Sequence, residues 1–183
     1  MKTHTIILWI FILIIADQVI KIIINSFFLE SQFEIIPSLF EFRPSFNDKH
    51  TYVNSLVHRE FNVNIGLWPH IIMFILIEVV IFILYSYFRN NIHERKTLLD
   101  VSFVFQMAGI ICALIGNLIW KNGTLDYIYL KPLFIFDLKD LYISCFAIMF
   151  LAYFHKNRAL IKRMKMKEVV SWFHDAITKK EKG

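Results

Sequence analysis

The stretch PHIIMFILIEVVIFILYSYF, residues 69–88, decides the fold class of this chain. Glu78 is the only Asp, Glu, Lys or Arg in it. A helix of roughly 20 mainly apolar residues is long enough to cross the hydrocarbon core of a bilayer. We therefore expect residues 69–88 to form a transmembrane helix.

Three further stretches have the same character, at about Thr5–Ile24, Leu98–Ile119 and Leu138–His155. The whole chain of 183 residues is 57% hydrophobic and contains 19 phenylalanines, more apolar surface than a soluble core of this size can bury. The first stretch lacks a following small-x-small cleavage pattern, so we expect a retained helix and not a cleaved signal peptide. The sequence predicts an all-α membrane protein with four transmembrane helices.

Basic residues predict the orientation of these helices, because Lys and Arg gather on the cytoplasmic side. Residues 89–97 and the tail 157–183 are rich in them, whereas residues 25–68 carry five acids and three bases. Both termini should be cytoplasmic, and residues 25–68 and 120–137 should lie outside. We expect short strands within residues 25–68, because aromatic and polar residues alternate there.

The chain divides into a four-helix domain, residues 1–156, and a basic cytoplasmic tail, residues 157–183. Apolar residues in the tail follow helical spacing, at Met166, Val169, Val170, Phe173 and Ile177. The pattern is typical of an amphipathic helix on the inner leaflet. A solvated tail that only fixes topology is an equally good interpretation.

Several polar residues interrupt the predicted spans. Asp17 and Lys21 lie four apart on one helix face, so they should form an internal, mainly structural ion pair. Glu78 lies in mid-span, and the sequence does not identify its partner. Small residues in the third span, Gly109, Cys112, Ala113 and Gly116, should let a second helix approach closely. Asn117 follows them and is able to bond across helices.

Two aspartates, Asp126 and Asp140, fall at the outer membrane boundary. Each has a simple structural explanation: Asp126 pairs with Lys121 or Lys131, and Asp140 is a first-turn acid after an N-cap at Asp137. Together they have a chemical use. Two carboxylates held close share one proton, so one accepts a proton from water while the other polarises a peptide carbonyl.

Other chemistries have less support. The seven histidines show no metal-ligand spacing, and a Gly-rich phosphate loop is absent from the sequence. The basic charge is explained by topology. We therefore expect no metal, no other cofactor and no nucleic-acid partner.

Five short segments, in order, resemble bacterial lipoprotein signal peptidase (signal peptidase II) along about residues 10–155. They are Asp17-Gln18-x-x-Lys21, Ile36-Pro37 through Phe46-Asn47, Gly116-Asn117, Leu125-Asp126-Tyr127-Ile128 and Phe136-Asp137-Leu138-Lys139-Asp140. Asn64-Ile65-Gly66 is a rival match for the segment ending at Asn47, with poorer flanking residues.

The resemblance implies a monomeric aspartic endopeptidase of the bacterial cytoplasmic membrane. It would cut a prolipoprotein before its lipid-modified cysteine, in contact with membrane lipids, and a globomycin-type cyclic peptide would inhibit it. Asp126 and Asp140 would be catalytic. Asn47, Asn117, Asp137 and Lys121 would position the substrate and the dyad. Outside the membrane, residues 25–68 would form a small β-cradle with a short helix or lid.

The sequence also departs from the family pattern. Trp120 and Lys121 stand where the family has Asp and Arg, Asp137 replaces its Asn, and Lys139 replaces its Ala. Residues 48–52 replace a Gly-Ala-Ala-Phe stretch. These changes leave open an alternative: a catalytically impaired homologue that binds a lipoprotein or lipid without cleaving it. A small transporter or assembly subunit is a third interpretation, supported only by Glu78 and the Asp17–Lys21 pair.

Overall fold

The computed structural model describes residues 1–48, 52–63, 65–92, 94–162 and 165–180. Within them, four helices are long and apolar enough to cross a bilayer, as the sequence predicts. They are α1 (Thr3–Ile23), which continues as the π-helical turn η1 (Ile24–Phe28), α3 (Leu67–Asn91), α4 (Lys96–Leu118) and α5 (Leu138–Lys156). The apolar stretches and the helices agree to within a few residues.

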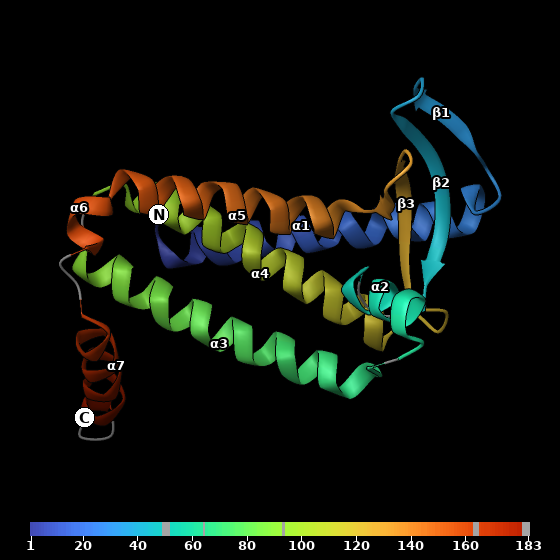
Figure 1. The fold of residues 1–183 in the computed structure, drawn as a ribbon. Helices are drawn as coiled ribbons and strands as arrows, with labels where there is room; N and C mark the ends of the chain where they lie inside the picture. Colours follow the sequence, from blue (N-terminus) through green and yellow to red (C-terminus); the bar gives the residue numbers. More distant parts are fainter. Residues whose placement is uncertain (49–51, 64, 93, 163–164, 181–183) are drawn as a thin grey trace.

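Helix α4 is the central element of the bundle. It packs against α1, α3 and α5 and is the most buried of the four spans. Figure 1 shows α1 and α5 on one side of α4 and α3 on the other. Gly109 allows the close contact with α5, since a Cβ there would lie 2.8 Å from Ile143 Cγ1. The small-residue face predicted for the third span is therefore an actual packing surface.

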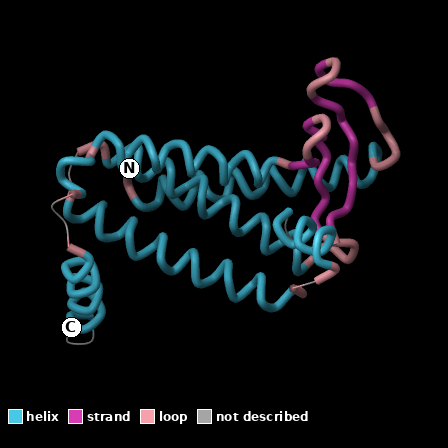
Figure 2. Tube along the Cα trace, in the orientation of Figure 1, coloured by secondary structure: helices cyan, strands magenta, loops and turns pink. Residues whose placement is uncertain are grey.

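A four-stranded antiparallel sheet stands at one end of the bundle (Figure 2). Its order is β1 (Phe33–Ile36), β2 (Phe40–Asn47), β3 (Thr124–Leu130) and β4 (Phe134–Phe136). Strands in residues 25–68 were expected, but β3 and β4 were not. The register pairs Phe42 with Ile128 and Ser45 with Asp126, so the sheet joins two segments far apart in sequence. Helix α2 (Tyr52–Phe61) lies at the same end of the molecule (Figure 1).

The tail forms helices α6 (Arg158–Ile161) and α7 (Met166–Lys180) at the other end, near the N-terminus (Figure 1). Helix α7 packs against α3, where Trp172 meets the ring of Tyr87 edge-on and Val169 is buried. Val170 remains exposed. The side chains of Met166 and Ile177, from the same predicted stripe, fall outside the described part of the chain. A helix forms here, while its contact with the inner leaflet stays a prediction.

Candidate functional site

The N-terminus of α5 holds two aspartates in a capping box. Asp137 is the N-cap, as predicted, and its Oδ1 accepts a hydrogen bond from the Asp140 backbone N–H at 3.3 Å. In return, the Asp137 backbone N–H donates to Asp140 Oδ2 at 3.1 Å. The two reciprocal bonds satisfy N–H groups that the first helical turn leaves without partners. They also fix both carboxyl groups at the end of the helix.

Strand β3 brings Asp126 to the same place. The turn before β3 depends on Gly123, whose φ is +92° and whose absent Cβ would lie 2.3 Å from Asn47 O. Any side chain at this position would force β2 and the turn apart. One carboxylate oxygen from each of Asp126, Asp137 and Asp140 lies within 4.8 Å of the others. The structure therefore brings together the two aspartates that the sequence singled out, and adds Asp137.

The ammonium group of Lys139 lies among these three carboxylates. Its Nζ is 2.8 Å from Asp126 Oδ1, 2.9 Å from Asp137 Oδ1 and 3.3 Å from Asp140 Oδ2. An ammonium has three N–H donors, so each carboxylate receives one. Three carboxylates at this spacing would otherwise suit a divalent cation. Here a lysine supplies the positive charge.

The predicted pair of Asp17 and Lys21 is formed, and it extends to α5. Lys21 Nζ lies 2.9 Å from Asp17 Oδ2 and 2.6 Å from Asp137 Oδ2. All three side chains are almost fully buried. Asp137 therefore bridges two ammonium groups, one from α1 and one from α5. The first helix is tied to the site itself, which the i, i+4 spacing alone could not indicate.

Charges in this cluster do not balance. It contains four carboxylates (Asp17, Asp126, Asp137, Asp140) and two ammonium groups (Lys21, Lys139), which leaves two negative charges in excess when every group is ionised.

Burial and neighbouring charges shift the pKa values of two acids in this cluster in opposite directions. Burial raises the pKa of Asp126, against the opposing effect of Lys139. Burial alone would also raise the pKa of Asp137, but Lys139 and Lys21 hold it below its usual value. The pKa of Asp137 is thus shifted down and that of Asp126 is shifted up. Pairs of acids pushed apart in this way are typical of acid–base sites.

A pocket of about 330 Å³ opens beside the cluster. Its polar lining consists of Asn47, Thr124, Asp126, Lys139, Asp140 and Ser144, and its apolar lining includes Phe74 and residues of β4. Asp140 is 41% exposed at its side chain and reaches the pocket, whereas Asp137 is sealed behind it. The Thr124 hydroxyl is buried and, among the described residues, has no hydrogen-bond partner. A ligand in the pocket would be able to supply one.

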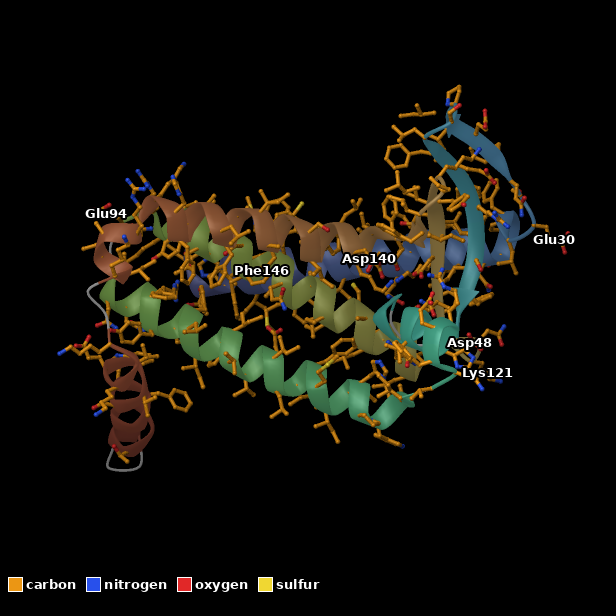
Figure 3. All side chains as sticks on the ribbon, viewed as in Figure 1. Glu30, Asp48, Glu94, Lys121, Asp140 and Phe146 are labelled. Atoms are coloured by element: carbon orange, nitrogen blue, oxygen red, sulfur yellow. The ribbon has the colours of Figure 1, made fainter. Side chains whose placement is uncertain are left out.

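The predicted positioning residues have different places. Asn47 lines the pocket. Asn117 Nδ2 donates to Ala113 O at 2.9 Å, on its own helix, and Ala113 is a lining residue. Lys121 is exposed and lies beside Asp48, away from Asp140 (Figure 3). Neither Lys121 nor Lys131 pairs with Asp126, because Lys139 does; Lys131 binds Glu34 and Glu41 instead. Residues 49–51 and Asn64 fall outside the described residues.

Sequence reasoning missed some members of the site, and it marked Trp120 only as a departure from the family pattern. Trp120 Nε1 donates to Gln18 Oε1 at 3.3 Å, and Gln18 Nε2 donates to Asp17 Oδ2 at 2.8 Å, so Trp120 joins the network through α1. Phe74, Thr124 and Ser144 carry no motif that would have marked them. In the sequence, Lys139 stood out only because it replaces the alanine of the family pattern.

Comparisons with known proteins agree with this architecture. A sequence model of the family described as signal peptidase (SPase) II matches residues 9–156. A solved structure of a bacterial membrane enzyme superposes with a TM-score of 0.63 at 21% identity, over 90% of this chain and 95% of that one. A second one gives 0.60 at 22% identity, over 88% and 96%. These two likenesses concern the fold alone. No curated protein sequence matches the chain.

Proposed function

Because this chain belongs to the signal peptidase II family, we propose that it is an aspartic endopeptidase that cleaves a prolipoprotein before its lipid-modified cysteine. The observation that carries the proposal is the meeting of Asp126 and Asp140. They come from β3 and α5, yet both line one pocket and both contact Lys139 Nζ, at 2.8 and 3.3 Å. Two carboxyl groups held this way activate water without a covalent intermediate.

The surroundings of the pocket suit a lipid-anchored substrate. An apolar groove of about 510 Å³ runs between α3 and α4, and Phe74 lines both the groove and the pocket. Apolar chains of the substrate would lie in the groove while the peptide bond reaches the aspartates. We propose that the sheet end lies on the outer side of the cytoplasmic membrane and both termini on the inner side, because basic residues gather in residues 89–97 and in the tail 157–183.

Substitution of each aspartate tests the proposal. In detergent micelles, Asp126→Asn and Asp140→Asn should each lower cleavage of a diacylglyceryl-modified prolipoprotein by ~10²–10⁴-fold, the usual contribution of an acid or base. Glu30→Gln is the control, since Glu30 is exposed at the far edge of the molecule (Figure 3). Undiminished cleavage by either asparagine variant would overturn the assignment.

A second candidate function, binding without cleavage, is supported by the position of Lys139. The Lys139 ammonium occupies space between the two aspartates, where an aspartic peptidase would hold water and the scissile carbonyl. A permanent block there would leave a protein that binds a lipoprotein without cleaving it. Such a protein would show no turnover on any lipid-modified substrate and would still bind globomycin. Turnover by the wild type that depends on Asp126 and Asp140 excludes this alternative.

A further inference from the structure

Lys139 is the feature of the site that a simple pair of aspartates does not explain. It lies in the same pocket as Asp126 and Asp140, and its amine is within 3.3 Å of both. Two neighbouring carboxylates share one proton because ionising both is unfavourable. An ammonium between them lowers that cost, since it attracts both carboxylates.

We propose that the Lys139 ammonium is the electrophile of this site, polarising the scissile carbonyl while ionised Asp140 accepts the proton of water. This inference deepens the proposed peptidase function and rests on it. It replaces the protonated aspartic acid of a dyad with a fixed cation. Asp126 and Asp137 then hold the cation in place.

The contacts of Lys139 with the three carboxylates indicate a different role for each. Asp126 and Asp137 bind Lys139 at 2.8 and 2.9 Å and are buried, so they act as its anchors. Asp140 has the longest contact, 3.3 Å, and the most exposed side chain, so water reaches it. When substrate enters, exchange of this longest contact for the carbonyl oxygen turns one N–H of Lys139 toward the reacting bond.

The chemical step balances with these groups alone. Asp140 takes a proton from water as the water oxygen bonds to the carbonyl carbon, and the carbonyl π electrons move to the oxygen held by Lys139. When the C=O bond re-forms, the C–N bond breaks and the proton on Asp140 passes to the leaving nitrogen. Lys139 stays protonated throughout, so it acts by charge and hydrogen bonding, as an oxyanion hole does.

The charge pattern explains how the site tolerates the cation. Lys139 and Asp137 contact each other at 2.9 Å, so their charges cancel and the net charge of the pocket is what a neutral pair would give. Asp137 also binds Lys21 at 2.6 Å, which keeps it ionised beside Lys139. Other ionisable groups face this centre from neighbouring elements: Asp17 and Lys21 from α1, Cys112 from α4, Tyr127 from β3 and Tyr142 from α5.

A paired substitution gives the sharpest test. Asp137→Asn with Lys139→Ala removes one anion and one cation together, so the net charge is kept and a two-aspartate dyad remains. Such a dyad works only while it holds one proton, so its cleavage rate should fall with rising pH at a lower pH than the wild-type rate. The wild type should keep its activity further into alkaline pH, because a lysine stays charged there.

Single substitutions supply the second readout. Lys139→Met should lower kcat by ~10²–10³-fold with little change in KM, as loss of an oxyanion donor does. Lys139→Arg keeps the charge and should retain both more activity than Lys139→Met and the alkaline profile. Lys131→Met is the matched control, since Lys131 also bridges two carboxylates but lies on an exposed turn. Thermal unfolding and globomycin binding show whether each variant is folded.

The results of these experiments distinguish failure of the proposed role of Lys139 from failure of the proposed peptidase function. If the wild type cleaves, the asparagine variants do not, and the paired variant cleaves with an unchanged pH profile, Lys139 is no electrophile although the peptidase function stands. If only the paired variant cleaves, Lys139 is a block, and both proposals fail. An inactive wild type with an inactive paired variant also overturns both.

Discussion

Each end of α4 buries a network of charged groups, and the two networks differ in the ratio of negative to positive charges. At the sheet end, four carboxylates meet two ammonium groups beside a pocket. At the other end a single carboxylate, Asp100, accepts hydrogen bonds from Tyr85 Oη at 2.8 Å and pairs with Arg89 Nε at 3.0 Å. The amino group of Met1 also contacts Asp100, and the Tyr85 ring stacks on Phe103.

The two networks differ in charge compensation and in access to a pocket, and these two properties separate a structural cluster from a reactive one. Two cations, Arg89 and the amino group of Met1, compensate the charge of Asp100, so this network ties the N-terminus and α3 to α4. The sheet-end cluster retains excess negative charge and faces a pocket, which is where reactive carboxyl groups are found. We therefore expect substitutions at the sheet end to change activity and those around Asp100 to change stability alone.

Lys21→Met should have the largest effect on stability. It leaves Asp17 and Asp137 buried with one cation fewer, and breaking a buried pair costs about 3–5 kcal/mol of unfolding free energy. Thermal unfolding in micelles measures the loss, with Lys131→Met as the control, since Lys131 is only partly buried. The double variant Asp17→Asn, Lys21→Met removes a carboxylate with the amine and should recover part of it. Equal stability of Lys21→Met and the wild type would mean that the cluster is not held by charge pairing.

Asp100→Asn should have a smaller effect, confined to stability. The amide keeps an acceptor for Tyr85, and Arg89 is 31% exposed and can turn toward solvent. We expect a loss of about 1–3 kcal/mol, typical of hydrogen bonds to charged groups. Cleavage per folded molecule, measured as kcat/KM, should not change. A tenfold fall in kcat/KM would erase the distinction between the two ends.

Sequence alone was sufficient for the helical part of the fold. The four spans follow from length and hydropathy, which depend on neighbouring residues only. The capping box at Asp137 and the Asp17–Lys21 pair are local for the same reason. Strand β3 was missed because its pairing with β2 joins residues some eighty positions apart, and β4 pairs only with β3. No local pattern in residues 120–137 records that pairing.

The sequence singled out the two aspartates of the candidate site, but it did not indicate that a lysine lies between them. Asp126 and Asp140 were singled out by position and resemblance, but Lys139 was only an odd residue in a motif. The contact of Lys139 with Asp126 depends on where β3 lies relative to α5, and no local sequence pattern indicates that arrangement. The same holds for Glu78, whose partner Gln106 is set by the relative rotation of α3 and α4. Lys121, by contrast, is exposed, and Lys139 forms the ion pair with Asp126.

Glu78→Gln should raise stability slightly. Glu78 Oε2 accepts a hydrogen bond from Gln106 Nε2 at 3.1 Å within the apolar groove, and the described residues place no counter-ion on it. A neutral amide keeps the contact and avoids burying an acid in mid-span. We expect a gain of ~1 kcal/mol or less in thermal unfolding. Gln106→Leu should have the opposite sign, since it removes the partner and leaves the acid. A clear loss of stability in Glu78→Gln would show that this acid has a role of its own.

Glu34→Gln should have the smallest effect. Hydrogen bonding to Lys131 lowers the pKa of Glu34, so its contribution to stability is present above its unfolded pKa and is lost as pH falls through the folded value. The side chain is 53% exposed, and Lys131 also binds Glu41 Oε2 at 2.8 Å, so solvent and the second carboxylate replace most of what is removed. Thermal unfolding at neutral pH should not distinguish the variant from the wild type, and any small difference should vanish under acidic conditions. A loss comparable with that of Lys21→Met would mean that burial is not what separates strong ion pairs from weak ones in this protein.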